Sequence, residues 1–345
     1  MPPKAQRTPQ RTPPRTQKRA RRPLAAAPAP TRRREREPGG FPVDELERAI
    51  ERAGLTYPPH LVGSLAAGLD AGKHIILTGP PGTGKTSLAY MAAEVAADTM
   101  LCSGYLPTTA TSGWTTDETI GSLVMTREGM VFRAGLFVDA MQTGRWLIID
   151  EINRADLDLS FGPLFTVLSG SSVVLPFARP GHTTSLSIVP SGAEIPKDTE
   201  PIHVPSRWRL LATMNVFDKN TLHRLSYALM RRFAFIDVPS PDDDAMEQLI
   251  QGPGDFVLSL LDLRKYRDLG PAIFLDAQKF AAHRMADGVS ESRALLEAFY
   301  SFFLPQFDGL AEEGGHLYDT LSKVFAAPER DELRRAIRTV LGPGR

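Results

Sequence analysis

The sequence predicts an α/β fold, in which a parallel sheet carries helices on both faces, followed by a smaller α-helical domain. Up to about residue 240, apolar runs of strand length alternate with helical patterns, which is typical of a buried parallel sheet. Beyond Pro239-Ser240-Pro241 the strand patterns largely end and helical periodicity continues. The 345 residues are also enough for two domains with separate cores.

The first forty residues differ in composition from the rest of the chain. They hold 12 Lys and Arg against 2 Asp and Glu, a net charge of +10, so that residues 41–345 carry −10. This Pro- and Arg-rich segment contains no aromatic residue and cannot bury enough apolar surface to offset its conformational entropy. We therefore expect residues 1–40 to be disordered. Their charge suits a nucleic acid or an acidic partner, and it equally suits a solvated tail without a partner.

The overall composition is that of a soluble protein, with 42% hydrophobic and 23% charged residues. No apolar run is long enough to cross a membrane, and no basic stretch leads into the apolar run of a secretory signal. A single cysteine, Cys102, excludes an internal disulfide and is best explained as a small buried hydrophobe. Together these features predict a cytoplasmic protein without membrane contact.

The predicted elements begin near Phe41 with two helices, over Val43–Ala53 and Leu61–Leu69, whose apolar residues recur at helical spacing. The apolar run His74–Thr78 predicts a buried strand, which leads through a glycine-rich loop into an Ala-rich helix ending near Ala97. The further core strands are predicted at Met100–Ser103, Trp146–Ile149, Arg209–Thr213 and Phe233–Val238, with helices at Phe137–Gln142, Leu159–Leu168 and Leu222–Arg231.

Two hairpins interrupt this part, pairing Leu123–Met125 with Met130–Phe132 and Val173–Phe177 with Ser185–Val189. The later helices are predicted at Ala245–Ile250, Phe256–Tyr266, Ala277–Met285, Ser292–Phe303 and Glu329–Val340. The predicted organisation is a tail over residues 1–40, an αβα domain over 41–240 and a helical domain over 241–345.

The strongest motif is Gly79–Thr86, GPPGTGKT, a full match to the phosphate-binding pattern G-x-x-x-x-G-K-[ST] between a strand and a helix. Its glycines let the backbone approach phosphate oxygens closely, and the helix N-terminus favours an anion. Lys85 adds a positive charge for the β and γ phosphates, and the Thr86 hydroxyl is expected to bind Mg²⁺. The predicted nucleotide-binding residues of this segment are Gly79, Pro80, Gly82, Thr83, Gly84, Lys85, Thr86 and Ser87.

Two adjacent carboxylates, Asp150 and Glu151, follow the apolar run Trp146–Ile149. Acidic residues at strand ends are common and are weak evidence alone. Here they indicate a nucleotide site, because a phosphate-binding loop precedes them in the chain. We expect Asp150 on the Mg²⁺ side of the site and Glu151 as the general base for an attacking water.

The ordered motifs GPPGTGKT, DEINRA, ATMN and LSYALMRRFAF resemble those of AAA+ ATPases, and within them the MoxR/McrB-type, dynein-related branch. The resemblance covers about Leu61 to Pro241 and continues more weakly through the helical part. It implies a P-loop NTPase αβα sandwich with a helical lid, ATP and Mg²⁺ as ligands, GTP as an alternative nucleotide, and self-association into a ring, expected to be a hexamer.

The resemblance also assigns roles to single residues. Asn215 matches the sensor 1 position, which orients the lytic water, although an Asn can simply cap a strand end. Arg232, next to Arg231, matches the arginine finger that reaches the neighbouring subunit's γ-phosphate; a solvated basic pair is the alternative. Arg293 matches the nucleotide-binding sensor 2 position more loosely, and Arg154 is expected at a subunit interface.

The first hairpin resembles the helix-2 insert of this branch, which points into the pore of the ring. Met125, Arg127 and Met130 are then candidates for substrate contact, with packing of the hairpin as an equal alternative. Three functions fit the sequence. The first is a MoxR-like chaperone that remodels a protein partner. The second is a McrB-like NTPase motor of a DNA-restriction complex, and the third is a slow nucleotide-dependent switch.

Overall fold

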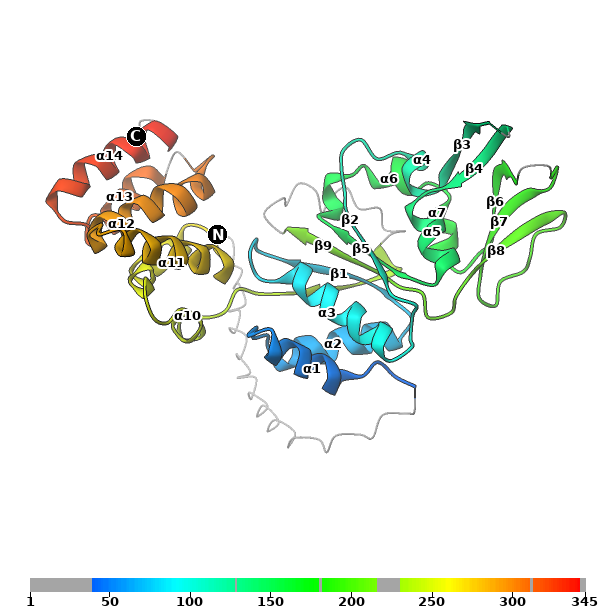
Figure 1. Cartoon of the computed structure of the whole chain (residues 1–345), viewed down its shortest axis with the longest axis horizontal. Coiled ribbons are helices and arrows are strands. Elements are labelled where there is room, and N and C mark those ends of the chain that lie inside the picture. Colours follow the sequence, from blue (N-terminus) through cyan, green and yellow to red (C-terminus); the bar gives the residue numbers. More distant parts are fainter. Residues whose placement is uncertain (1–38, 128, 180–181, 216–229, 311–312, 342–345) are drawn as a thin grey trace, which may run out of the picture. The chain divides into compact units, whose positions relative to one another are not determined.

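A computed structural model describes residues 39–127, 129–179, 182–215, 230–310 and 313–341 of the chain (Figure 1). The described residues from Gly40 onwards form one compact unit. Residues 1–38 of the predicted tail and most of the helix predicted over Leu222–Arg231 lie outside the described residues. The division at residue 240 stays a prediction.

A five-stranded parallel sheet forms the centre of the fold (Figure 1). Its spatial order is β10-β1-β9-β5-β2, and all neighbouring strands run parallel. The strands are β1 (His74–Gly79), β2 (Tyr105–Thr109), β5 (Trp146–Asp150), β9 (Leu210–Asn215) and β10 (Phe233–Asp237). Their carboxyl ends therefore meet at one edge of the sheet, which we call the carboxyl edge.

Helices cover both faces of this sheet, because alternate strand residues point to opposite sides. Ile75 and Ile148 pack with the helices α1 (Val43–Arg52), α2 (Pro59–Asp70) and α3 (Lys85–Asp98). Their neighbours Ile76 and Leu147 pack on the other side with α5 (Leu136–Thr143), α6 (Leu157–Phe161) and α7 (Leu164–Leu168). The predicted αβα sandwich with a parallel sheet is confirmed.

Two predicted elements of this sandwich were wrong. Met100–Ser103 forms turns, and the strand lies further on as β2, which contains Pro107. A proline lacks an N–H group for pairing, and β2 accommodates it because it is the edge strand. The helix predicted over Leu159–Leu168 is divided into α6 and α7 at Gly162-Pro163, where Gly162 adopts φ 37° and ψ −117°.

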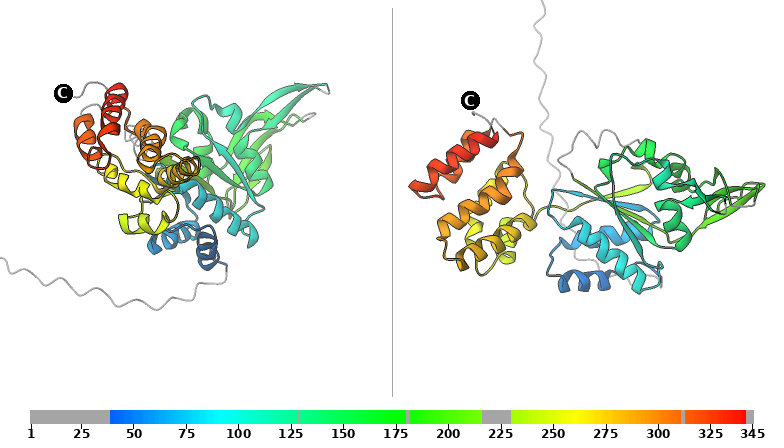
Figure 2. Two further views of the ribbon diagram at one scale, coloured as in Figure 1. Left: turned by 60° about the vertical axis from the view of Figure 1, so that its left-hand side comes forward. Right: turned by 45° about the horizontal axis from the view of Figure 1, so that its top comes forward.

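Both predicted hairpins are confirmed. After the short helix α4 (Thr116–Thr119), β3 (Gly121–Thr126) pairs antiparallel with β4 (Gly129–Ala134), and β6 (Val173–Ala178) pairs antiparallel with β7 (Ser185–Pro190). A strand that the sequence did not predict, β8 (Thr199–Val204), lies parallel to β7. The hairpins lie side by side (Figure 2), with the rings of Phe132 and Phe177 stacked at 5.0 Å between centroids.

Beyond β10 the described chain is helical and has a separate core, formed by residues such as Phe274, Leu296 and Leu333. Its elements are α10 (Asp243–Leu249), a 3₁₀ segment (Asp255–Lys265), α11 (Pro271–Ala286), α12 (Glu291–Ala298), a π-helical segment (Phe299–Phe303), a 3₁₀ segment (Leu304–Phe307), α13 (Gly314–Leu321) and α14 (Ala327–Leu341). A helical region thus follows the sheet, as predicted. A 3₁₀ segment replaces the α-helix that was predicted over Phe256–Tyr266. Within the described ranges, no helix combines the length and apolarity that crossing a bilayer requires.

Candidate functional site

A cavity of about 410 Å³ opens at the carboxyl edge of the sheet. The glycine-rich loop, the ends of β5 and β9, the loop after α1 and the first turn of α11 contribute to its lining. The predicted site residues in this lining are Gly82, Thr83, Gly84, Lys85, Thr86, Ser87, Asp150, Glu151 and Asn215. One end of the cavity is therefore polar, and its apolar residues come from other elements, among them Leu55, Leu249 and Leu275.

The loop between β1 and α3 needs glycine at two positions. Gly79 has φ 147°, and a Cβ there would lie 2.2 Å from the Val238 carbonyl oxygen. Gly84, the residue before α3, has φ 80°, and a Cβ there would lie 2.5 Å from the Tyr57 hydroxyl. That hydroxyl donates to the Gly84 carbonyl at 2.9 Å. Tyr57 from the loop after α1 thus fixes the phosphate-binding loop, a contact that the sequence did not indicate.

Lys85 is buried at the centre of this loop. Its Nζ donates to the carbonyl oxygens of Gly79 at 3.0 Å and Pro80 at 2.5 Å. Burial lowers the pKa of Lys85 to about 8, against the opposing effect of Asp150 and Glu151. A cation and loop amides before a helix N-terminus form a site for an anion such as a phosphate group.

Asp150 receives two hydroxyl groups on one oxygen. Its Oδ1 accepts from Thr86 Oγ1 at 2.7 Å and from Thr213 Oγ1 at 2.5 Å. The pair of Thr86 and Asp150 therefore offers a hydroxyl and a carboxylate oxygen side by side, the ligand types that Mg²⁺ prefers. These two residues fit the predicted metal position.

Glu151 turns its carboxylate toward the same cavity from the residue after β5. Its backbone has φ 51°, a left-handed conformation that is unusual for a non-glycine residue, and its N–H donates to Thr213 Oγ1 at 3.0 Å. The carboxylate accepts from Asn215 Nδ2 at 3.3 Å through one oxygen and from Arg154 at 2.9 Å through the other. The predicted base and the predicted sensor 1 residue thus lie in contact.

Thr213 was not predicted as a site residue, yet its single hydroxyl contacts both members of the acidic pair. The run ATMN gave the available indication, because a threonine two residues before Asn215 in a strand faces the same way. No comparable pattern marks Tyr57 or the residues Pro271, Ala272 and Leu275, which α11 brings to the cavity.

Arg232 lies at the opposite, amino edge of the sheet. Its carbonyl accepts from the N–H of His74, the first residue of β1, at 3.2 Å, whereas the phosphate-binding loop follows the last residue of β1. At about 3.3 Å per residue, six strand residues separate the two by about 17 Å. Arg232 lines a second cavity of about 570 Å³ with Gly72, Lys73, His74, Leu168, Ser169 and Arg231.

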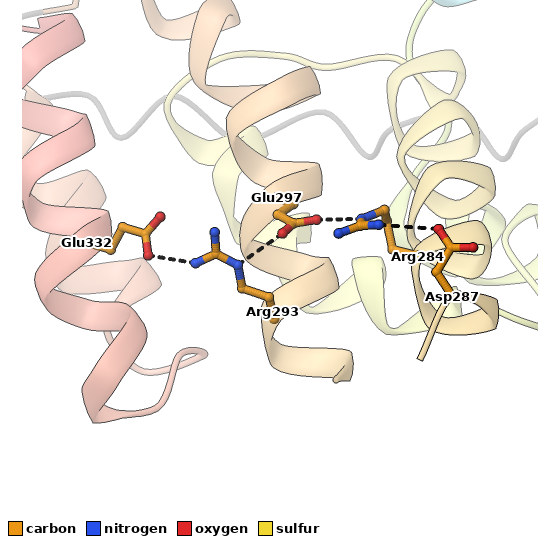
Figure 3. A network of polar contacts seen from close by, with 5 residues as sticks. All are labelled: Arg284, Asp287, Arg293, Glu297 and Glu332. Carbon is orange, nitrogen blue, oxygen red and sulfur yellow. Dashed lines mark hydrogen bonds and ion pairs between the residues drawn. The ribbon is translucent and has the colours of Figure 1, made fainter. Parts of the chain in front are cut away.

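Arg293 belongs to a network of ion pairs between helices α11, α12 and α14 (Figure 3). It donates to Glu297 at 3.0 Å and to Glu332 at 2.6 Å, and Glu297 also accepts from Arg284 at 2.7 Å. The described lining of the cavity at the carboxyl edge does not include Arg293. Its sensor 2 role stays a prediction.

Comparison with known proteins gives a family match. The family described as AAA domain (dynein-related subfamily) matches residues 74–233. The type IV methyl-directed restriction enzyme EcoKMcrB subunit of Escherichia coli is 28% identical over 200 residues, covering 56% of this chain and 40% of that protein. An uncharacterized protein of Staphylococcus aureus is 32% identical over 186 residues, covering 53% of this chain and 61% of that protein. The chain thus spans less than two thirds of the length of either relative.

Among solved structures, NtrX from Brucella abortus in complex with ATP aligns over 86% of this chain and 72% of that chain. The sequence identity is 13% and the TM-score is 0.41. The matched segment 74–233 contains the glycine-rich loop, both carboxylates and Asn215. Residues 74–233 therefore match an AAA domain of the dynein-related subfamily, and the chain is similar to the EcoKMcrB subunit.

Proposed function

We propose that the chain binds and hydrolyses ATP with Mg²⁺ as the motor of a ring-shaped assembly that remodels a partner macromolecule. The observation that supports this most strongly is the single hydrogen-bonded group formed by Thr86, Asp150, Thr213, Glu151 and Asn215 beside the glycine-rich loop. The first turn of α3, the end of β5 and the end of β9 bring these side chains to one cavity, where they offer a metal site and a base beside the anion site of the loop.

In the proposed reaction, Lys85 exchanges its two carbonyl acceptors for phosphate oxygens and stays protonated there. Amides of the loop from Gly82 to Lys85 hold the remaining phosphate oxygens. Thr86 and Asp150 would hold Mg²⁺, which neutralises negative charge on the phosphates when bound. The apolar end of the cavity, with Leu55 and Leu275, is the proposed place of the purine base.

Glu151 is the proposed base that accepts a proton from the attacking water. Asn215 donates a hydrogen bond to one carboxylate oxygen of Glu151. This contact fixes the carboxylate, and thereby the water that it activates, relative to the phosphates. Arg232 lies too far from the cavity of its own chain for direct contact. It is therefore assigned to the nucleotide of a neighbouring copy, where its charge stabilises the transition state.

The hairpin β3–β4 is the proposed contact with the partner. Met125 and Met130 face each other across its strands and are 76% and 53% exposed. Exposed methionines adapt to varied surfaces, which suits a protein that remodels a protein substrate. The similarity to the EcoKMcrB subunit supports a second candidate, a motor subunit of a DNA-restriction complex. For this candidate, GTP is the alternative nucleotide.

The variant Glu151→Gln tests the proposal. It keeps the size and the Asn215 contact of the side chain and removes the base, so ATP binding should persist while turnover falls by about 100-fold or more. Glu247→Gln, at an exposed position of α10, is the matched control and should hydrolyse ATP like the wild type. Unimpaired turnover of Glu151→Gln would remove this residue as the base, and a folded wild type that binds neither ATP nor GTP would refute the proposal.

A further inference from the structure

We propose that Ser169 is a positioning residue for Arg232, which sets the direction of this guanidinium group at the amino edge of the sheet. The inference rests on the function proposed above for Arg232 and adds a residue to it. Ser169 follows α7 and is 63 residues away from Arg232 in the sequence. Nothing in the sequence pattern marks this serine, so the assignment comes from its contacts.

The first contact is direct, because Arg232 Nε donates to Ser169 Oγ at 2.6 Å. The Ser169 hydroxyl in turn donates to the Phe165 carbonyl one helical turn earlier. A hydroxyl has one proton and two acceptor lone pairs. Because the hydroxyl proton points to the Phe165 carbonyl, the Ser169 oxygen presents its lone pairs to the guanidinium group. The hydroxyl is therefore held in the orientation in which it accepts the hydrogen bond from Arg232.

The α7 helix gives this acceptor a fixed place. Leu164 and Val167 are buried in the main core cluster, and the Ser169 N–H donates to carbonyl oxygens of the last turn of α7. The backbone of the arginine pair is held as well. Arg232 O accepts from the His74 N–H, and Lys73 Nζ donates to Arg231 O at 3.0 Å.

A guanidinium group is planar and rigid, so holding its Nε and its backbone restricts the orientation of the whole plane. The other side chains of the second cavity support an ionic function. Lys73, Arg231 and Arg232 place three cationic groups around about 570 Å³, together with Ser169. Such a cavity favours a polyanion, and the proposed occupant is the γ-phosphate end of the nucleotide bound by a neighbouring copy of this chain.

The test compares Ser169→Ala with Ser64→Ala in the full-length chain. Ser64 is a matched control because its hydroxyl also donates to the carbonyl one turn earlier, His60 O at 2.8 Å, and lies on the exposed surface of α2. Ser169→Ala should lower kcat for ATP about 10-fold and leave the Kd for ATP unchanged, because a mispositioned finger affects the transition state. Ser169→Thr, which keeps a hydroxyl, should recover most of the activity, and Ser64→Ala should match the wild type.

A double-mutant comparison separates positioning from a general structural effect. In an Arg232→Ala background, adding Ser169→Ala should cause no further loss of kcat, because the group that Ser169 orients is already absent. A further loss in that background, or a wild-type kcat of Ser169→Ala alone, would overturn the assignment of Ser169 while the proposed function stands. A wild type that binds ATP without hydrolysing it would overturn both.

Discussion

At the scale of single residues, Thr213 joins the Asp150 carboxylate to the backbone of Glu151 through one hydroxyl group. It donates to Asp150 and accepts from the Glu151 N–H, and its side chain is buried in β9. The hydroxyl therefore fixes the carboxylate of the proposed metal site and the backbone of the proposed base at the same time. A change of this one group should disturb the chemistry while the phosphate-binding loop stays intact.

We expect Thr213→Val to lower kcat for ATP by about 10- to 100-fold. Valine keeps the shape of threonine but removes a hydrogen bond to a charged group, a loss of about 1.5–3 kcal/mol. Steady-state turnover and direct nucleotide binding would be measured together, and the Kd for ATP should change little. Thr213→Ser keeps the hydroxyl and should retain most of the turnover. Wild-type kcat in the valine variant would contradict the assigned role.

The lowered pKa of Lys85 leads us to expect that nucleotide binding depends on pH. Its pKa in the unliganded chain is lowered to about 8 by burial, and phosphate groups raise the pKa of a lysine that they contact. Binding therefore requires uptake of a proton above about pH 8. The affinity for ATP should be nearly constant between about pH 7.5 and 8 and should fall by up to about tenfold per pH unit above that.

Titration of nucleotide affinity up to about pH 9.5 would measure this dependence. Lys85→Arg is the control, because a guanidinium group stays protonated over the whole range and should remove the slope even where it weakens binding. A wild-type affinity that is independent of pH up to 9.5 would show that Lys85 does not bind the phosphates as a titrating cation.

At the scale of elements, His74 joins the first residues of β1 and β9. Its Nδ1 accepts from the Leu210 N–H at 3.0 Å, and its ring packs against Trp208 and Phe233. Burial lowers the pKa of His74 to about 3. In the unfolded chain its pKa returns to about 6.5. Below that pH the imidazole is therefore protonated in the unfolded state and stays neutral in the folded state.

The folded state should accordingly lose stability as the pH falls below about 6.5. Between pH 7 and 5.5 the contribution of His74 amounts to about 1 kcal/mol in the free energy of unfolding. His74→Asn offers an oxygen in place of Nδ1 and does not titrate. Urea unfolding of both proteins at the two pH values should show the larger loss in the wild type, and equal losses would contradict the assignment.

The sequence predicted the central strands and both hairpins because their apolar patterns are continuous and bounded by turns. The prediction failed where the secondary structure of a segment depends on its place in the folded protein. The residues of β2 include Pro107, which argues against a strand until the strand is known to lie at an edge. Helical periodicity runs through Leu159–Leu168, and the conformation of Gly162 divides it.

The same limit applies to the site. The motif residues around Lys85 and Glu151 could be predicted because each motif is local and its order along the chain is specific. The contact of Tyr57 with Gly84 and that of Ser169 with Arg232 join segments far apart in sequence. Such contacts depend on how elements pack, and no short pattern encodes them.

At the scale of the whole molecule, the site of one chain is complete only with Arg232 of another, if the proposed function holds. Arg232→Ala and Lys85→Ala should each be nearly inactive alone, the first for lack of the finger and the second for lack of phosphate binding. Mixed in equal amounts, they should recover roughly a quarter of wild-type turnover, because a random arrangement pairs an intact loop with an intact finger at one contact in four.

The measurement is ATP hydrolysis by the mixture at a concentration where the wild type is fully active. A mixture no more active than its components would contradict action between chains, because a finger that serves its own chain cannot be supplied by a neighbour. Wild-type turnover per chain should also rise with protein concentration until assembly is complete.

The parallel pairing of β1 and β10 has a consequence for how copies of the chain communicate. It puts the phosphate-binding loop and Arg232 at opposite ends of neighbouring strands, so the surface that offers the arginine and the surface that accepts it do not coincide. A two-fold symmetric contact uses the same surface on both copies. The separate surfaces of Arg232 and the phosphate-binding loop instead favour a head-to-tail contact between copies. In the proposed ring, each copy would give Arg232 to the site of one neighbour and receive Arg232 from the other, so nucleotide cleavage in one site would affect the next copy in one direction around the ring.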